Sequence, residues 1–313
     1  LEKWFAEFTG TKHAIMCGSG TQALYLAYKA LGIGPGDEVI TVAHTFSATF
    51  DQIHAVGAVP ILVDIGEDGL IDPLEVEKAI TPKTKAIVPV HLEGKVCNIS
   101  ELYRIAKTHK LYIVEDAAQA VGAFGVGTGD ISCYSFYPAK ILGTLGNAGM
   151  VTTNDDELAN KVSNLRANYR FEKELDYGMN FEPDNVWAAV LNVRKNYLLE
   201  YIKRRAEIAR IYDEGLKGLP IKLPLQQPGR VYQDYVIRVE NRVEFLKHLD
   251  ENGVDYLGTE VPYYPDHKKL NLSFDLPKTK LYLQQQVRIP LHPYLTNEEI
   301  EYVIKVINDF FKK

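Results

Sequence analysis

The stretch LYIVEDAAQ at residues 111–119 is the strongest indication of the fold. It begins as an apolar run containing β-branched residues, ends on the two carboxylates Glu115 and Asp116, and continues into small residues. A strand that is apolar on both faces is typical of a parallel sheet covered by helices on either side. A carboxylate at the end of such a strand either caps the next helix or points at a ligand, and the stretch by itself leaves both interpretations open.

The same pattern of short apolar strands extends in both directions from this stretch. Further strands are expected at residues 13–17, 38–42, 59–64, 85–90, 131–137 and 148–153, and helical periodicity separates most of them, at 21–31, 48–56, from 72 onward and at 100–109. This alternation predicts an α/β fold with a mostly parallel sheet. Residues 1–8 have the pattern of an amphipathic helix and not of a signal peptide.

The second half of the chain has a different pattern. One long helix is expected from about residue 184 to 216, followed by a strand at 232–239, a helix at 244–252 and a last helix that starts at Thr296. Glu299, three residues after Thr296, completes a capping box. We therefore expect a large domain at residues 1–195 and a smaller C-terminal α+β domain at residues 196–313.

Composition excludes several classes of function. The chain has 313 residues with 35 Lys+Arg against 41 Asp+Glu, a net charge of −6, and no long basic run, which argues against nucleic acid or a membrane surface as partner. No apolar run reaches the length of a membrane span. The three cysteines are widely spaced, which predicts free thiols, a cytoplasmic location and no metal site. The basic cluster at residues 203–205 is expected to be a solvated helix face.

Two glycine-containing segments raise the question of a phosphate site. GSGT at residues 18–21 follows the first strand and opens a helix, so it is either a phosphate-binding turn or a plain turn capped by Ser19. The segment GVGTG at residues 125–129 is followed by a strand and not a helix, so the context of a dinucleotide site is missing.

Lys140 ends the segment SFYPAK and stands among apolar residues and glycines. Burial disfavours the charged ammonium, and a neutral amine is the form that adds to an aldehyde. The alternative is a lysine that extends to solvent, as most lysines do.

These segments resemble one known family when taken together. GSGT at 18–21, GPGDEVI at 34–40, EDAAQ at 115–119 and SFYPAK at 135–140 occur in the order typical of the DegT/DnrJ/EryC1/StrS sugar aminotransferases, and the resemblance continues to residues 290–293. It implies a fold-type-I aminotransferase that uses pyridoxal 5′-phosphate (PLP).

The resemblance also implies a role for individual residues. Lys140 would bind PLP covalently and move the substrate proton, while Asp116 would pair with the pyridine nitrogen. Around them, Gly20, Thr21 and Ser135 would hold the phosphate, Phe46 would stack on the ring, and Gln119 would lie near the ring 3-oxygen. Asn180 would reach the phosphate of a neighbouring subunit's cofactor, which implies a homodimer.

The expected reaction moves an amino group from an amino acid, L-glutamate by preference, to a keto group of a nucleotide-diphosphate-linked deoxysugar. The segment LGTLGNAG at residues 142–149 resembles members acting on 3-keto more than on 4-keto sugars. A dehydratase branch of the family has His where Lys140 stands, so Lys140 favours the aminotransferase. Cyclitol amination, dehydration and a non-catalytic PLP-binding regulator remain as alternatives.

Overall fold

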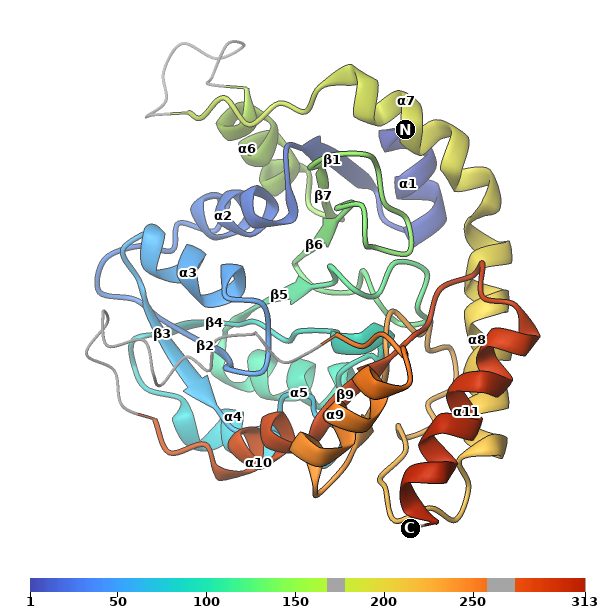
Figure 1. Ribbon diagram of the computed structural model, residues 1–313. Coiled ribbons are helices and arrows are strands. Elements are labelled where there is room, and N and C mark those ends of the chain that lie inside the picture. The colour runs from blue at the N-terminus through green and yellow to red at the C-terminus, as the bar shows by residue number, and fades with distance from the viewer. Residues whose placement is uncertain (168–177, 258–273, 313) are drawn as a thin grey trace.

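The computed structural model describes residues 1–167, 178–257 and 274–312. Its main element is a seven-stranded sheet in the order β1-β7-β6-β5-β4-β2-β3 (Figure 1). In chain order the strands are β1 (His13–Cys17), β2 (Glu38–Val42), β3 (Val59–Val63), β4 (Thr84–Ile87), β5 (Tyr112–Asp116), β6 (Ile131–Ser135) and β7 (Gly149–Thr153). Only β7 runs antiparallel to its neighbours β1 and β6, so the predicted mostly parallel sheet is confirmed.

Helices cover both faces of this sheet, because its strands are apolar on both sides. One core contains buried residues of α2 (Gly20–Ala30), α3 (Ala48–Ala55) and α6 (Asp156–Arg166), and the other contains those of α4 (Pro73–Ala79) and α5 (Ile99–His109). The first helix, α1 (Glu2–Thr9), packs beside β1.

The long helix expected from residue 184 to 216 is wrong as a single element. The structure has α7 (Asn185–Arg194), a 3₁₀ turn η2 (Lys195–Tyr197) and α8 (Leu198–Gly215). The 3₁₀ turn has fewer residues per turn than an α-helix. Over only three residues this change does not alter the spacing of apolar residues enough to be seen in the sequence.

The C-terminal part contains a second, two-stranded sheet of β8 (Tyr235–Arg238) and β9 (Gln286–Ile289) with α9 (Arg242–Glu251) and α11 (Asn297–Phe311). The strand expected from residue 232 is shorter than predicted, because Tyr232 has a φ of 45°, which an extended strand cannot contain. The capping box at Thr296 and Glu299 is confirmed. In Figure 1, α8 and α11 lie side by side.

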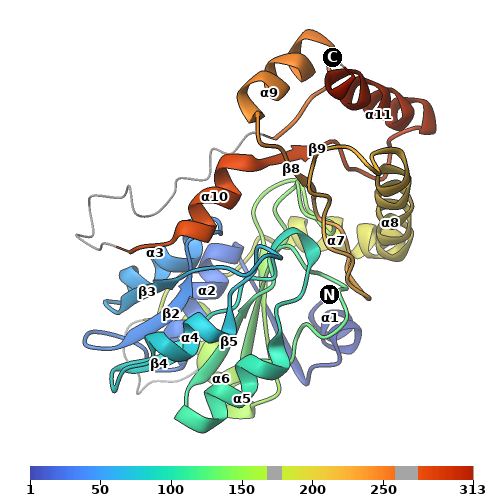
Figure 2. The ribbon, with the colours of Figure 1, turned by 90° about the horizontal axis from the view of Figure 1, so that it is seen from below.

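Helix α10 (Pro277–Gln285) connects this part to the large sheet. Asp64, just after β3, accepts hydrogen bonds from the backbone N–H of Lys278 (2.9 Å) and of Thr279 (2.7 Å) at the start of α10. Tyr282 of α10 is buried in the same core as α4 and α5. Figure 2 shows α10 between the large sheet and the β8–β9 pair. The domain boundary at residue 196 stays a prediction, and α10 joins the two parts across it.

Three further properties concern the described residues only. None of their helices is long and apolar enough to cross a membrane. They contain no cluster of three or more His, Cys, Asp or Glu side chains that could hold a metal ion. The three cysteines are buried free thiols.

Candidate active site

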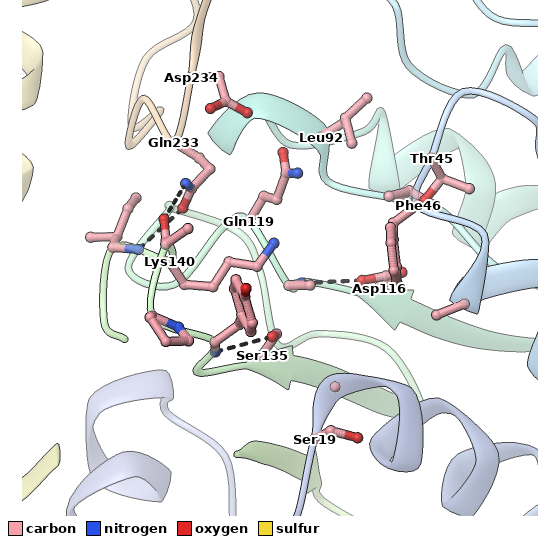
Figure 3. A pocket seen from close by; sticks show the side chains of 18 of the residues that line it. Ser19, Thr45, Phe46, Leu92, Asp116, Gln119, Ser135, Lys140, Gln233 and Asp234 are labelled. Atoms are coloured by element: carbon pink, nitrogen blue, oxygen red, sulfur yellow. Dashed lines mark hydrogen bonds between the residues drawn. The ribbon is translucent and has the colours of Figure 1, made fainter. Parts of the chain in front are cut away.

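A cavity of about 850 Å³ lies where the large sheet meets the C-terminal part (Figure 3). Seven of the eight residues predicted for the site line it: Gly20, Thr21, Phe46, Asp116, Gln119, Ser135 and Lys140. The eighth, Asn180, is exposed on the protein surface, does not line the cavity, and forms a β-bridge with Ala167.

The seven residues converge because each lies at, or soon after, the carboxyl end of a strand of one sheet. Asp116 and Ser135 are the last residues of β5 and β6, which are parallel neighbours. Phe46 follows β2, and Gly20 opens the helix after β1. Carboxyl ends of parallel strands meet at one edge of a sheet, and ligands of such folds bind there.

Asp116 is a buried carboxylate held by neutral donors. Its Oδ2 accepts a hydrogen bond from the Thr49 hydroxyl at 2.7 Å, and its Oδ1 accepts one from the backbone N–H of Ala118 at 3.2 Å. The Thr45 hydroxyl lies 2.9 Å from that of Thr49. In the part of the chain that the structure describes, Asp116 has no ion-pair partner. A charged carboxylate fixed this way is suited to a cationic N–H of a ligand.

Lys140 directs its amine into the cavity, toward Gln119 and Asp116 (Figure 3). Within the described residues this amine makes no hydrogen bond or ion pair. Burial lowers the pKa of Lys140; Asp116 and Asp234 oppose this shift, whereas Arg288 adds to it. The net lowering increases the fraction of neutral, nucleophilic amine at physiological pH.

The start of α2 forms a cradle for an anion. Ser19 caps the helix by accepting from Gln22 N–H at 3.1 Å, as one interpretation of GSGT expected. The N–H groups of Gly20 and Thr21 have no partner among the described residues, and the helix dipole adds a positive field there. A Cβ on Gly20 would lie 2.8 Å from Cβ of Ser135, so only glycine lets the helix start approach β6 this closely.

These features together fit PLP. The cavity offers a helix N-terminus for its phosphate, a buried carboxylate for its ring nitrogen and an amine of lowered pKa for its aldehyde. Gln119 uses its Oε1 to accept from the N–H of Glu93 at 2.7 Å, and among the described residues its amide NH₂ has no partner, which leaves it for a ligand. Phe46 is 68% exposed at the cavity.

The expected solvated face at residues 203–205 is wrong for Arg205. This side chain is buried, lines the cavity, and donates to the carbonyl oxygens of Tyr232 (3.2 Å), Gln233 (3.0 Å) and Leu291 (2.9 Å). The sequence contained a signal for this, because Arg205 stands three residues before Ile208 on the apolar side of α8.

Other residues of the cavity wall were not predicted as site residues, although His292 lies in the segment 290–293 to which the family resemblance extends. They come from α7, α8 and the C-terminal part: Arg194, Tyr201, Gln233, Asp234, Arg288, His292 and Tyr294. Burial raises the pKa of Asp234, although Arg288, whose guanidinium lies 3.8 Å away, opposes this shift.

The glycine-rich segment at residues 125–129 binds a side chain of the protein itself. The backbone N–H groups of Gly127 (2.9 Å), Thr128 (2.8 Å) and Gly129 donate to the carboxylate of Glu115. His91 Nε2 lies 3.0 Å from the same carboxylate. The segment is therefore an internal anion-binding turn, in agreement with its missing dinucleotide context.

Residues 1–308 match the DegT/DnrJ/EryC1/StrS aminotransferase family, and the chain belongs to it. It is 38% identical to dTDP-3-amino-3,4,6-trideoxy-alpha-D-glucose transaminase of Streptomyces venezuelae, over 100% of this chain and 86% of that protein. It is also 38% identical to the pleiotropic regulatory protein of Geobacillus stearothermophilus, over 100% of this chain and 88% of that protein. The solved structure of NtdA from Bacillus subtilis with bound cofactor PMP superposes with a TM-score of 0.93 at 34% identity, covering 100% of this chain and 76% of that one.

Proposed function

We propose that this chain is a PLP-dependent aminotransferase that moves an amino group from an amino acid, L-glutamate by preference, to a keto group of a nucleotide-diphosphate-linked deoxysugar. The observation that carries the proposal is the shared cavity of Lys140, Asp116 and the free N-terminus of α2. The bound cofactor of NtdA, PMP (pyridoxamine phosphate, the aminated form of PLP), supports PLP as the cofactor of this chain. The Streptomyces transaminase supports a nucleotide-linked deoxysugar as substrate and position 3 as the site of amination.

PLP, when bound, supplies an electron sink for the carbon that loses its proton. The chain's own residues do the rest. The N–H groups of Gly20 and Thr21 would hold the phosphate of PLP, and Asp116 would accept a hydrogen bond from the ring N–H and keep the ring nitrogen protonated. Lys140 would bind the cofactor covalently and, once released from it, would accept the proton that the substrate carbon loses and return it later in the reaction.

The cavity wall formed by α7, α8 and the C-terminal part has the chemistry that a nucleotide sugar requires. The guanidinium groups of Arg194 and Arg288 line it, and such groups bind diphosphate with parallel hydrogen bonds. The rings of Tyr201 and Tyr294 also line it, with their hydroxyl oxygens 2.8 Å apart, and aromatic faces of this kind stack on bases.

The proposal is tested by two half-reactions. Wild-type protein with PLP should lose its visible absorbance on addition of L-glutamate and regain it on addition of a dTDP-linked 3-keto deoxysugar. Lys140→Ala should fold and bind PLP non-covalently, yet do neither. Full turnover of this variant would refute the assignment of Lys140.

The choice of substrate decides among the alternatives. Faster return of the absorbance with a 4-keto sugar would overturn the preference for position 3. Return of the absorbance only with a cyclitol ketone would identify cyclitol amination. Loss of water from the substrate without amino transfer would identify a dehydratase. Bound PLP that exchanges with no amino donor would identify a regulator.

We also propose that the enzyme is a homodimer in which Asn180 completes the partner's site. Support comes from the position of Asn180 outside its own cavity and from the exposed apolar side chains of Phe46 (68%) and Leu145 (71%). Mixing Lys140→Ala with Asn180→Ala subunits should restore one intact site per hybrid dimer, and thus about a quarter of wild-type activity after random exchange. No restoration would show that Asn180 does not act in the partner's site.

A further inference from the structure

Gln233 lies in the loop before β8 and bonds to the backbone on both sides of Lys140. Its Nε2 donates to the carbonyl oxygen of Ala139 at 2.9 Å, and its Oε1 accepts from the N–H of Ile141 at 3.1 Å (Figure 3). Gln233 is 8% exposed, so water does not compete freely for these bonds. The side-chain amide of Gln233 therefore holds the backbone of the residue before Lys140 and of the residue after it.

The loop that carries Gln233 is itself fixed from two directions. Arg205 of α8 donates to the carbonyl oxygens of Tyr232 and Gln233, and the same guanidinium nitrogen donates to Leu291 after β9. These hydrogen bonds attach the loop of Gln233 both to α8 and to the segment that follows β9. The backbone at Lys140 is thereby attached to elements far from it in sequence.

The backbone around Lys140 has few other attachments. The N–H of Lys140 donates to the carbonyl oxygen of Tyr137 at 2.9 Å. Among the described residues, the Ala139 carbonyl and the Ile141 N–H have no hydrogen-bond partner except Gln233. Loss of Gln233 would leave both groups unpaired, and the turn would shift to find new partners.

We propose that Gln233 is a positioning residue that holds the backbone on both sides of Lys140 and so aims its amine at the site of reaction. The inference rests on the proposed role of Lys140. Gln233 does not take part in the chemistry; it acts through the place and direction of the lysine. Because a misplacement of about 1 Å can lower a rate about 100-fold, a bond pair on this backbone is expected to control turnover.

The first test is Gln233→Met, which keeps the length of the side chain and removes both hydrogen bonds. The chain offers a matched control, because Gln227 bonds the backbone of Val96 in the same two-ended way, accepting from its N–H and donating to its carbonyl oxygen, both at 2.7 Å. Gln227 does not line the cavity. Gln227→Met therefore removes a similar pair of bonds away from Lys140.

Two readouts separate positioning from a loss of stability. In the holoenzyme, the pH midpoint of the visible absorbance of lysine-bound PLP reports the surroundings of Lys140. The rate of the half-reaction with L-glutamate reports proton transfer. Gln233→Met should shift the midpoint and lower the rate about 10- to 100-fold. Gln227→Met should leave the midpoint in place and the rate within about twofold of wild type.

Gln233→Glu adds a test that depends on pH. The protonated carboxyl can donate to Ala139 and accept from Ile141 as the amide does, whereas the carboxylate can only accept. Activity relative to wild type should therefore rise as the pH falls. The charged groups around this position are Lys140, Asp234, Arg205 and Arg288, and wild type measured over the same pH range corrects for their titration.

Each outcome decides. If Gln233→Met and Gln227→Met have the same pH midpoint and the same half-reaction rate, the positioning role is overturned. The proposed function still stands in that case, provided that the wild-type holoenzyme reacts with L-glutamate. A wild type without lysine-bound PLP overturns both. If Gln233→Met does not fold, Gln233→Glu is compared with Gln227→Glu, and a pH-independent loss shared by both refutes the inference.

Discussion

Replacing Glu93 by Gln is expected to destabilise the protein more than any exposed charge substitution would. The carboxylate of Glu93 is 1% exposed and lies 2.9 Å from Nζ of Lys95 and 3.7 Å from the guanidinium of Arg230, which are 4% and 0% exposed. The hydroxyl of Tyr282 donates to it at 3.1 Å. Glu93→Gln keeps the shape but leaves two buried cations without their counter-charge.

The size of the effect follows from the pKa of Glu93. Burial alone would raise this pKa, but Lys95, His44 and Arg230 together lower it from 4.5 to about 2. Such a depression corresponds to about 3 kcal/mol of stability, and breaking a buried ion pair costs about 3–5 kcal/mol in other proteins. Because the pKa is depressed in the folded state, this stability is fully present above pH 4.5 and is lost as the pH falls toward 2.

The assay is thermal unfolding at fixed protein and PLP concentrations. At pH 7 the unfolding midpoint of Glu93→Gln should fall by about 5 °C relative to wild type, and this difference should narrow below pH 4.5. Glu101→Gln is the matched control, since Glu101 pairs with Arg104 at 2.8 Å on the surface, where such pairs contribute at most about 1 kcal/mol. Equal midpoints for the two variants would show that the buried cluster does not stabilise the fold.

Two further substitutions test the cofactor site. Asp116→Asn should keep PLP bound but slow the half-reaction with glutamate about 100-fold or more, because the charge that holds the ring N–H is gone; a normal rate would contradict the electron-sink assignment. Gly20→Ala should weaken PLP binding at least about tenfold in equilibrium dialysis, because the new Cβ meets Ser135 at 2.8 Å. Gly34→Ala, whose Cβ would have 3.6 Å of clearance, is the control, and similar PLP affinities for both variants would refute the cradle.

The large sheet and most of the candidate site could be predicted because their signals are local. Asp116 and Ser135 each end an apolar strand, and a parallel sheet brings such ends together whatever the loops between them do. Likewise, Ser19 and Gly20 specify a capped helix start within four residues.

The opposite wall of the cavity could not be predicted, because its residues are defined by contacts between distant segments. Gln233 has no local pattern around it, and its role depends on a backbone more than ninety residues away. The expected strand starts at Tyr235 and not at Tyr232, because Tyr232 has a positive φ that its local sequence does not signal. Arg205 could have been recognised from its spacing to Ile208, whereas its carbonyl partners could not.

The neighbours Glu115 and Asp116 show how the strand assigns different functions to similar side chains. Successive residues of a strand point to opposite faces, so only one of the two can reach the cavity. Asp116 faces it, whereas Glu115 turns into the backbone N–H groups of Gly127 and Thr128. A glycine-rich turn binds whichever anion the fold presents to it, and here that anion is Glu115 itself. The start of α2 differs because no carboxylate of the described residues accepts hydrogen bonds from its backbone N–H groups. These N–H groups are therefore free to bind a phosphate.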